Sequence, residues 1–517
     1  MPCKYSYWSW LQILREIRLN KNGSVASSNA AHLTSPTTGT KMLYRLCQDT
    51  FVRSIGTYGY IYSQLTKHDR TYSESGRVFL EALSRKPQTL ETLQGKATQK
   101  FDGVSADELQ TDLTEFLQSL ETDRYIVSGK TEQELDGKEP HFTYAENPKT
   151  ATYNYMQNLD DAAKYADTTE VLLAEYLERP RIHNCQIETT SCCNERCLHC
   201  YIPHELKTEI LPYEIIESIL KQLNEMGTLS LVLSGGEVLS HPHIAKILRK
   251  ARELDFSITI LSNLTLLNPE LIKVFKETNP SLVQTSLYST VPEEHDHITQ
   301  IKGSFAKTTA AIDALIAENI PVQISCPVMK SNFRSYKNVL RYAQERKCKS
   351  QTDFIMMARY DFSTENLAER LDLKETEELI RDIMAYDKEY GELIDTPIKK
   401  KSREEEAKEA ICGVGRDNLC IAASGVVYPC SGWQGMALGN AKEQPVKDIW
   451  ERSPKMLELR SITKGSIPQC LDCEDRQFCA PCLVRNFNES NGNYLKVNPH
   501  FCRAAKINRK IVEEAKR

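Results

Sequence analysis

Cysteine number and spacing constrain this chain more than any other feature of its sequence. Of its 17 cysteines, four fall between residues 192 and 200, eight fall between residues 412 and 502, and five are scattered. An odd total with tight CxxC-type spacings, and without a recognisable export signal, favours metal binding over disulfide bonds. The sequence therefore predicts two separate metal-binding regions.

The first region reads CNERCLHC from Cys193 to Cys200. Three thiolates at this CxxxCxxC spacing can hold three irons of a [4Fe–4S] cluster and leave the fourth iron open, as a catalytic metal site requires. The alternative is a structural zinc site that borrows Cys192 or His199 as a fourth ligand. Structural zinc uses closed four-ligand coordination, so the three-cysteine spacing favours the iron–sulfur cluster.

Length and charge exclude several classes of protein. A chain of 517 residues predicts roughly three domains. Lysine and arginine number 65 against 70 acidic residues, and this net charge of −5 argues against a general nucleic-acid binder. No apolar run of ~18 residues occurs, so we expect no membrane span. Residues 5–19 predict an amphipathic helix without signal-peptide features, and cytoplasmic residence is expected.

The sequence predicts five regions. They are an N-terminal segment and linker (1–40), a small winged-helix-like domain (41–128), a polar connector (129–180), a partial barrel (181–398), and a charged bridging helix that leads into a cysteine-rich domain (399–517). In the small domain we expect strands at 51–55, 58–65 and 125–127 and helices at 75–84, 88–101 and 105–120. We expect one connector helix at 169–177.

From His183 onward, predicted strands and helices alternate. The strands are expected at 185–189, 230–233, 257–261, 282–287, 322–325 and 353–357, and the helices at 213–225, 243–254, 270–276, 305–318 and 336–345. Repeated β–α units predict an α/β fold with a parallel sheet, here a partial (β/α)6 barrel, whose ligands bind at the carboxyl ends of the strands.

The loop after the first of these strands closely resembles the radical S-adenosylmethionine (SAM) superfamily. That family has an aromatic residue before the last cysteine, where this chain has His199. The resemblance implies that Cys193, Cys197 and Cys200 ligate a [4Fe–4S] cluster, with SAM chelating the fourth iron. Cys192 lies outside the motif. The resemblance also implies that the reduced cluster cleaves SAM to a 5′-deoxyadenosyl radical, which removes hydrogen from an unactivated carbon.

A second motif, SGGE at residues 234–237, ends the second strand and matches the family's glycine-glycine-glutamate motif. Glycines permit close backbone approach, and carbonyl and carboxylate oxygens suit the methionyl ammonium of SAM. Polar residues at the ends of the third and fourth strands match further SAM contacts, although such residues also commonly form turns. The resemblance thus assigns SAM binding to Gly235, Gly236, Glu237, Ser262, Asn263 and Ser286.

The C-terminal cysteines resemble the SPASM domain of radical SAM enzymes that modify peptides and proteins. The match includes Gly425 with four residues before Cys430, the x2 and x5 spacings from Cys470 to Cys479, and the distal Cys502. Only two residues separate Cys479 from the next cysteine, where the family usually has three. On count alone, two zinc sites are the alternative. The resemblance implies an inner auxiliary cluster on Cys412, Cys420, Cys430 and Cys482, and an outer one on Cys470, Cys473, Cys479 and Cys502.

The small N-terminal domain resembles the leader-peptide recognition element of peptide-modifying enzymes. The resemblance implies that a precursor peptide adds a strand to the sheet edge beside the third helix. The alternative is a winged-helix DNA binder. The third helix has no lysine or arginine and carries Asp107, Glu108, Asp112 and Glu115, which would repel phosphate.

Two further residues are candidates for the site. Cys326 ends a predicted strand and could donate a hydrogen atom, as in peptide epimerases, although a buried free cysteine more often packs as a small apolar side chain. Tyr288 follows the fourth strand and could line the site, although tyrosines are common in strands.

The resulting prediction is a radical SAM enzyme that matures a ribosomally made peptide, most simply by a thioether or carbon–carbon cross-link. Its expected partners are a precursor peptide and an electron donor such as flavodoxin or ferredoxin, with no nucleic acid and no membrane. The alternatives within the class are an epimerase and a formylglycine-type or quinone-cofactor maturase. The alternative from a different class is a zinc-stabilised scaffold that binds peptides or nucleic acid.

Overall fold

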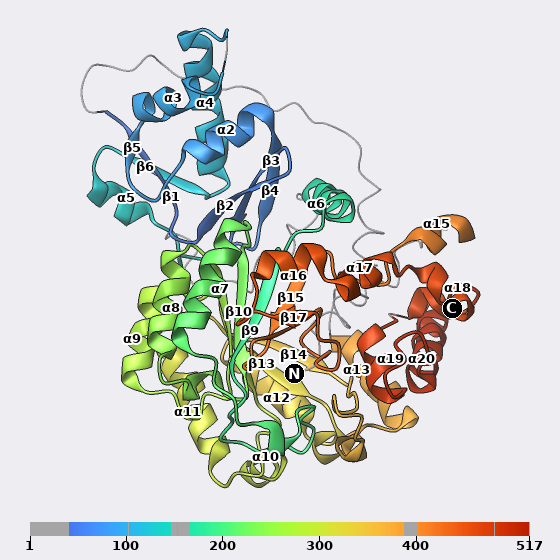
Figure 1. The fold of residues 1–517 in the computed structure, drawn as a ribbon. Helices are drawn as coiled ribbons and strands as arrows, with labels where there is room; N and C mark the ends of the chain where they lie inside the picture. The colour runs from blue at the N-terminus through green and yellow to red at the C-terminus, as the bar shows by residue number, and fades with distance from the viewer. Residues whose placement is uncertain are drawn as a thin grey trace. The chain divides into compact units, whose positions relative to one another are not determined.

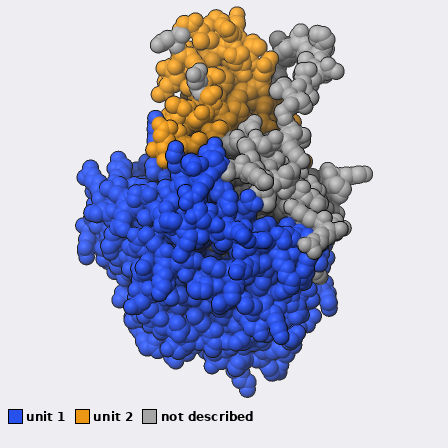
Figure 2. Space-filling view, turned by 90° about the vertical axis from the view of Figure 1, so that its right-hand side faces the viewer, with its two compact units in different colours: residues 1–18, 179–517 blue, residues 19–178 orange. Residues whose placement is uncertain are grey.

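The computed structural model describes residues 41–101, 103–145, 152–153, 166–386, 402–479 and 481–515. The predicted N-terminal helix and linker lie outside these residues. The chain divides into two compact units, which we call the N-terminal unit (described from residue 41 to 178) and the main unit (described from residue 179 to 515) (Figure 2). No helix among the described residues is long and apolar enough to cross a membrane.

Two small antiparallel sheets and three helices build residues 43–129 of the N-terminal unit (Figure 1). One sheet has the order β2-β3-β4 and the other has β1 between β5 and β6. The strands are β1 (Leu43–Leu46), β2 (Thr50–Ile55), β3 (Tyr58–Ser63), β4 (Asp69–Ser73), β5 (Gln88–Thr89) and β6 (Ile126–Gly129), and the helices are α2 (Glu74–Ala82), α3 (Leu90–Thr98) and α4 (Ala106–Thr122). The predicted strands and helices of this region are therefore present within a few residues.

Helix α4 forms because its first turn is capped and one of its faces is apolar. The Ser105 hydroxyl accepts a hydrogen bond from the Glu108 amide (3.2 Å) and satisfies one free N–H of the first turn. One face buries four leucines in the core of the unit: Leu109, Leu113, Leu117 and Leu120. The opposite face stays exposed, with the acidic residues named above.

The predicted polar connector contains more structure than its composition indicates. Helix α5 (Glu132–Lys138) is held by Arg45, whose guanidinium pairs with Asp136 at 2.8 Å and with Glu139 at 2.9 Å. Strands β7 (His141–Phe142) and β8 (Thr152–Tyr153) form a short parallel pair. Helix α6 (Ala166–Glu178) lies beside β4, where the Thr168 hydroxyl donates to the Asp69 carbonyl (3.4 Å).

One nine-stranded sheet organises the main unit, in the order β14-β13-β12-β11-β10-β9-β15-β16-β17. Its first six strands in sequence are parallel and run in chain order: β9 (Asn184–Thr190), β10 (Ser230–Gly235), β11 (Ser257–Leu261), β12 (Leu282–Ser286), β13 (Val322–Pro327) and β14 (Lys349–Asp353). The helices that alternate with them or follow them are α7 (Tyr213–Glu225), α8 (Ile244–Glu253), α9 (Pro269–Thr278), α10 (Pro292–Thr299), α11 (Ser304–Ala317), α12 (Tyr336–Glu345) and α13 (Leu373–Tyr386). The main unit therefore has the predicted α/β class.

The cysteine-rich region continues this sheet. Strand β15 (Asn418–Ile421) pairs in parallel with β9, and β16 (Val426–Tyr428) and β17 (Gly439–Asn440) extend the sheet in antiparallel fashion. The remaining helices are α15 (Arg403–Lys408), α16 (Val446–Arg452), α17 (Pro454–Ser461), α18 (Pro468–Leu471), α19 (Leu483–Glu489) and α20 (Pro499–Ala515). Of the predicted bridging helix at 399–409, only α15 lies within the described residues.

The predicted strand at 353–357 is wrong. Strand β14 ends at Asp353, and residues 354–358 have irregular backbone. These residues are apolar because they line a cavity, and side chains, not a neighbouring strand, bond three of their carbonyls. Buried irregular backbone and a buried strand have the same apolar pattern, so periodicity could not separate them.

We expect the Asp69→Asn variant to change how the N-terminal unit responds to pH. Burial raises the pKa of Asp69 from its ordinary 3.8 to about 6, so its protonated form stabilises the fold at low pH and that stability is lost as pH rises through about 6. Asparagine keeps an acceptor for the Tyr60 hydroxyl, which lies 2.9 Å away. The variant should be more stable than wild type at pH 7.5, on the order of 1 kcal/mol, and the difference should shrink at pH 5.

Hydrogen exchange of the β3 amides, compared between variants at each pH, measures this difference. Asp107→Asn, on the exposed face of α4, is the control. An Asp69→Asn effect of equal size at both pH values would contradict the assignment.

Candidate active site

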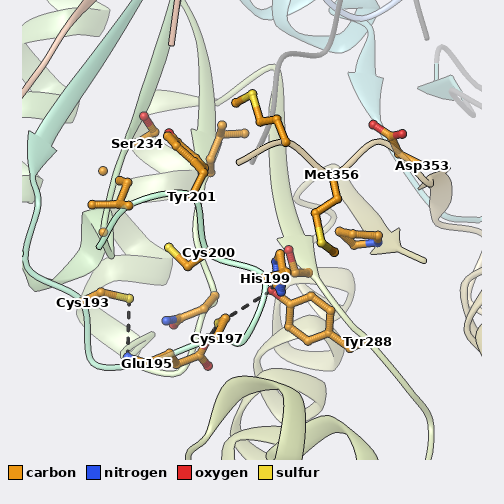
Figure 3. Close-up of a pocket in the computed structure, with 18 of the residues that line it drawn as sticks. Cys193, Glu195, Cys197, His199, Cys200, Tyr201, Ser234, Tyr288, Asp353 and Met356 are labelled. Atoms are coloured by element: carbon orange, nitrogen blue, oxygen red, sulfur yellow. Dashed lines mark hydrogen bonds between the residues drawn. The ribbon is translucent and has the colours of Figure 1, made fainter. Parts of the chain in front are cut away.

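The loop after β9 brings the three predicted cluster ligands to one end of a cavity at the carboxyl ends of the parallel strands (Figure 3). Cys193, Cys197 and Cys200 all line this cavity. The neighbouring Cys192 does not line it, and its Sγ lies 3.9 Å from the Glu209 carbonyl oxygen. The structure therefore gathers the CxxxCxxC cysteines and leaves Cys192 outside the group.

Burial keeps the thiols of Cys193 and Cys197 uncharged in the protein alone. It raises the pKa of Cys193 to about 12 and that of Cys197 well above its ordinary value, where nearby Glu195 adds to the effect. Glu195 is buried too, and burial raises its pKa to about 7. Thiolate ligands form here only when a cation compensates their charge, and soft iron is a cation that sulfur ligands prefer.

The polar groups at this end also fit a zwitterionic ligand. Glu195 Oε1 and His199 Nδ1 are buried without a hydrogen-bond partner among the described residues. Lys207 is the one lysine or arginine among the described residues that line the cavity. An amino acid headgroup such as that of SAM carries charges of both signs and can satisfy groups of both kinds.

Among the described residues, no three His, Cys, Asp or Glu side chains converge closely enough to share one metal ion.

His199 and Tyr288 form an aromatic contact beside the cysteines. Their ring centroids lie 5.0 Å apart, and the Tyr288 hydroxyl lies 3.5 Å from His199 Nε2 and 3.9 Å from Cys197 Sγ. Burial lowers the pKa of His199 to about 3, so the imidazole is neutral at physiological pH. The structure thus places Tyr288 in the cavity lining, as the sequence led us to expect.

Gly235 and Gly236 let two strand ends approach each other. A Cβ on Gly235, which has φ of +143°, would lie 2.0 Å from Thr190 O, and a Cβ on Gly236 would lie 2.3 Å from Cys192 O. Because neither residue has a Cβ, the strand ends can approach, and Gly236 N donates a hydrogen bond to Thr190 O at 2.8 Å. No other residue type permits this approach, which brings the SGGE turn against the cysteine loop.

The Glu237 side chain lies behind the strand ends that line the cavity. Its side chain is fully buried and does not line the cavity. Oε1 accepts from the Ser262 hydroxyl (2.6 Å) and Oε2 accepts from the Asn263 amide (2.7 Å). Glu237 therefore positions the end of β11 from behind, and its contact with the SAM ammonium stays a prediction.

The remaining predicted SAM contacts do reach the cavity, since Ser262, Asn263 and Ser286 all line it. Asn263 Nδ2 also donates to Asn194 Oδ1 (3.0 Å), and Asn194 Nδ2 donates to Thr265 Oγ1 (2.6 Å). This link ties β11 to the cysteine loop. Sequence reasoning missed Asn194, because only the folded sheet brings it to Asn263.

Cys326 does not reach the site. It is fully buried on β13 and does not line the cavity, although Pro327 after it does. Its sulfur lies 3.8 Å from both the Tyr288 carbonyl oxygen and Asn332 Nδ2. Successive strand residues point to opposite faces, and Cys326 faces away from the cavity. The structure thus supports the alternative that the sequence left open, a small apolar packing residue.

The C-terminal cysteines fall into two neighbourhoods. Burial raises the pKa of Cys479 to about 12, and the thiols of Cys470, Cys473 and Cys502 raise it further. Burial likewise raises the pKa of Cys412 to about 12, with added effects from Cys482 and Cys430. These neighbourhoods match the outer set and three members of the inner set.

Cys420 has more varied surroundings than the other members of the inner set. Burial raises its pKa well above the ordinary value, and Glu188, Cys185 and Cys430 contribute in that order. It lies within β15, opposite Tyr428 on β16. Its place as a fourth ligand of the inner set stays a prediction.

A buried carboxylate stands between the cavity cysteines and the inner set. Both oxygens of Glu188 lie within reach of Gln434 Nε2, at 3.0 and 3.1 Å, and burial raises the pKa of Glu188 to about 7. Tyr201, which lines the cavity, also bonds Glu188, and burial raises the pKa of Tyr201 well above its ordinary value, with added effects from Glu188, Cys420, Cys200 and Cys430. Sequence reasoning missed this group, although Tyr201 directly follows the CxxxCxxC motif.

Comparison with known families agrees with this geometry. Residues 187–343 match the radical SAM superfamily, and residues 412–474 match SPASM, an iron–sulfur cluster-binding domain. Similar proteins include an AdoMet-dependent heme synthase from Methanosarcina barkeri, 26% identical over 60% of this chain and 94% of the relative. The antilisterial bacteriocin subtilosin biosynthesis protein AlbA from Bacillus subtilis is 26% identical over 60% of this chain and 70% of that protein. A PqqA peptide cyclase from Gluconobacter oxydans is 23% identical over 56% and 82%.

Among solved structures, the fold is similar to that of Streptococcus suis SuiB bound to precursor peptide SuiA. The TM-score is 0.57 at 16% identity, over 88% of this chain and 99% of SuiB. SuiB bound to S-adenosylmethionine gives the same TM-score over 89% of this chain. The two domains indicate [4Fe–4S] clusters and SAM as cofactors. The chain thus carries a match to the radical SAM superfamily followed by a match to the SPASM domain, and these matches indicate that it is an enzyme.

Proposed function

We propose that this enzyme matures a ribosomally synthesised precursor peptide, whose leader binds the N-terminal unit and whose core enters the cavity. The observation that carries the proposal is the edge of β4 beside α4, where the outward backbone groups of Thr71 have no partner among the described residues, in a unit that precedes a radical SAM core. The resemblance to SuiB covers 88% of the chain, whereas the main unit from residue 179 accounts for 339 of the 517 residues. The likeness of fold thus extends into the N-terminal unit.

The β4 edge has the properties of a peptide-binding strand. Ser63 N donates to His68 O, which fixes the alternation of the antiparallel pair and turns the backbone groups of Asp69 and Thr71 outward. The Thr168 hydroxyl donates a hydrogen bond to the Asp69 carbonyl. The outward N–H and C=O of Thr71, by contrast, have no partner among the described residues. An added strand can satisfy them, as in other β-augmentation complexes.

Aromatic side chains border this edge. Tyr72 on β4 and Phe116 on α4 pack with ring centroids 5.0 Å apart, and Arg70 pairs with Asp123 at 2.7 Å. The exposed acidic face of α4 next to this contact gives no support to a DNA-binding role, because it repels phosphate. A peptide strand suits the edge better.

Within the main unit, Cys193, Cys197 and Cys200 would hold the SAM-binding cluster. When bound, the cluster and SAM supply a 5′-deoxyadenosyl radical that removes a hydrogen atom from an unactivated carbon. The protein's own residues position the reactants and exclude water. Asn263 and Ser286 line the SAM side, and Tyr288 closes the wall next to the cysteines.

We assign cross-linking as the reaction class. Joining a carbon radical to a peptide sulfur or carbon releases one proton and one electron, and the SPASM cysteines provide a site where an auxiliary cluster can accept the electron. The inner set is Cys412, Cys420, Cys430 and Cys482, and the outer set is Cys470, Cys473, Cys479 and Cys502. Epimerisation needs a hydrogen donor in the cavity, and Cys326 lies outside it.

Haem-type chemistry is the second candidate, because one relative is an AdoMet-dependent heme synthase. That relative aligns over 94% of its own length with only 60% of this chain. It therefore leaves about two fifths of this chain without a counterpart. A peptide substrate gives the N-terminal unit a role, whereas a porphyrin does not.

Iron content tests the cluster assignment. Anaerobically purified wild type should hold about twelve irons per chain, as three four-iron clusters. The triple variant Cys193→Ala/Cys197→Ala/Cys200→Ala should lose about four irons and all SAM cleavage. Cys192→Ala, at the adjacent thiol, is the matched control and should keep both. Zinc with little iron after reconstitution would contradict the radical proposal and favour the scaffold alternative.

Leader binding is tested at the β4 edge. Thr71→Pro removes the outward N–H, so a candidate precursor peptide should bind at least about tenfold more weakly, the loss expected for one or two backbone hydrogen bonds and a displaced strand. Thr71→Ala keeps the N–H and should bind as wild type. Fluorescence anisotropy of a labelled leader measures both. Equal binding by both variants would place the leader elsewhere.

A further inference from the structure

The wall of the cavity farthest from the SAM-contacting strand ends is almost entirely apolar. Pro327 and Val328 at the end of β13, and the run Phe354–Met357 after β14, all line it. Asp353 also lies here, but its Oδ1 is turned onto the Ile355 amide at 2.6 Å. The opposite wall, by contrast, is mostly glycine, serine and asparagine at the ends of β10, β11 and β12, with Leu261 as an apolar member. The cavity therefore has a polar half and an apolar half.

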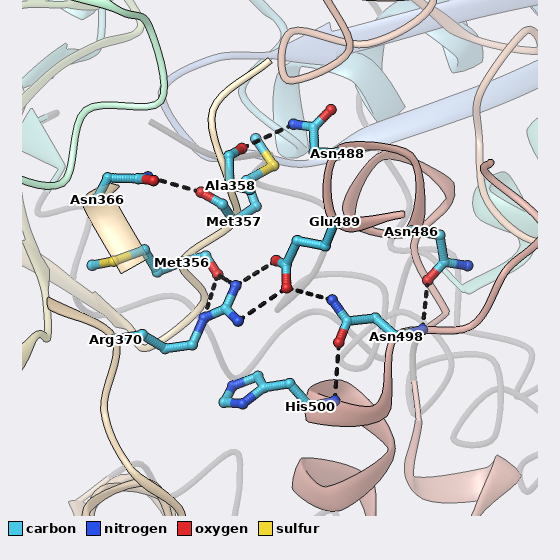
Figure 4. Close-up of polar contacts among 10 residues, drawn as sticks. All are labelled: Met356, Met357, Ala358, Asn366, Arg370, Asn486, Asn488, Glu489, Asn498 and His500. Atoms are coloured by element: carbon cyan, nitrogen blue, oxygen red, sulfur yellow. Dashed lines mark hydrogen bonds and ion pairs between the residues drawn. The ribbon is translucent and has the colours of Figure 1, made fainter. Parts of the chain in front are cut away.

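Side chains hold the apolar run through three consecutive carbonyls (Figure 4). The Met356 carbonyl accepts from Arg370 Nε at 3.0 Å and from Nη2 at 2.5 Å. The Met357 carbonyl accepts from Asn366 Nδ2 at 2.9 Å, and the Ala358 carbonyl accepts from Asn488 Nδ2 at 3.1 Å. Irregular backbone without a strand partner is thereby fixed in one conformation.

The group that orients Arg370 comes from the SPASM side of the chain. Arg370 makes two hydrogen bonds to the Glu489 carboxylate, with only 12% and 11% of the two side chains exposed. Asn498 Nδ2 donates to the same carboxylate at 2.6 Å. Glu489 ends α19, whose N-cap residue is Cys482, and Asn498 immediately precedes α20, which carries Cys502. The apolar run is thus tied to elements that hold candidate ligands of both auxiliary sets.

The two methionines of the run diverge. Met356 packs with Tyr288 and Ile298, next to the cysteine loop. Met357 points toward the SPASM side, where a Cβ on Gly432, two residues after Cys430, would lie 2.5 Å from its Cε. Met357 therefore separates the cavity from the inner set, and methionine is a soft side chain that adapts to varied apolar partners.

We propose that Met357 and its apolar neighbours receive an aliphatic or aromatic side chain of the peptide, and that Arg370 is a positioning residue for this wall. The inference rests on the proposed function and adds the class of residue that is modified. The apolar wall disfavours charged side chains, because most of its surface offers them no partner and Asp353 Oδ1 already accepts from the Ile355 amide. The Arg370–Glu489 pair holds the Met356 carbonyl and so fixes the position of the apolar wall relative to the substrate carbon that loses its hydrogen.

Deuterium transfer tests the wall without knowledge of the natural peptide. The probes are N-acetylated amino acid amides of leucine, phenylalanine, glutamate and lysine, each perdeuterated in its side chain, given with SAM and dithionite. We expect the leucine and phenylalanine probes to place deuterium in 5′-deoxyadenosine about tenfold more than the charged probes, the factor that burial of one such side chain provides. Met357→Gln should reduce this preference, whereas Met226→Gln, away from the cavity, should leave it unchanged.

Arg370→Lys tests positioning. Lysine keeps the charge but cannot bond Glu489 and the Met356 carbonyl in the same way. Hydrogen exchange at residues 354–358 should accelerate and the apolar preference should fall, while affinity for S-adenosylhomocysteine stays within about twofold, because the SAM side is built by other strands. Arg381→Lys, at a surface ion pair with Glu377, is the matched control.

Three outcomes would contradict the inference. They are 5′-deoxyadenosine without deuterium from the apolar probes, equal transfer from charged probes, and an Arg370→Lys variant with unchanged exchange and preference. In each of these the proposed radical chemistry still stands. Absence of 5′-deoxyadenosine altogether would instead contradict the proposed function, and the inference with it.

Discussion

The close approach of two strand ends is the interaction on which the site depends. Gly236 N donates to Thr190 O and Glu237 N donates to Cys192 O, both at 2.8 Å, so the turn after β10 is bonded directly to the start of the cysteine loop. A Cβ at Gly236 would lie 2.3 Å from the Cys192 carbonyl oxygen. The three cavity thiols therefore keep their place only while this turn contains glycine, and the SAM wall and the cluster loop form one structure.

Glu237 extends the same structure to the next strand. Its carboxylate is buried and holds Ser262 and Asn263, and Asn263 returns to the cysteine loop through Asn194. Burial raises the pKa of Glu237, and three hydrogen bonds, from Ser262, Leu239 and Asn263, act against that rise. A carboxylate that motif reasoning assigns to a ligand thus serves to align the polar residues that do face the cavity.

Sequence patterns could predict what depends on local order. The regularly spaced leucines of α4 and the β–α alternation from His183 recover α4, five helices of the main unit and five of the parallel strands, because periodicity follows burial of one face, but they miss α10 and α13. They could not distinguish a strand from residues 354–358, which are equally apolar. They also could not show that Cys326 faces away from the cavity or that Asn194 meets Asn263, since both depend on contacts between segments distant in sequence.

The pairing of β15 with β9 explains why the SPASM region and the radical SAM core act as one unit. Leu419 pairs with Cys185 and Ile421 with Ile187, so the strand that carries Cys420 lies directly beside the strand that leads to Cys193. Two buried side-chain hydrogen bonds also join the C-terminal region to the parallel sheet and its loops. Gln434 donates to Glu188, and Arg370 donates to Glu489. Because both hydrogen bonds are buried, a shift of the auxiliary cysteines must move a cavity wall or leave a buried charge unpaired, and the second option is costly. The shape of the cavity and the positions of the C-terminal cysteines are therefore physically coupled.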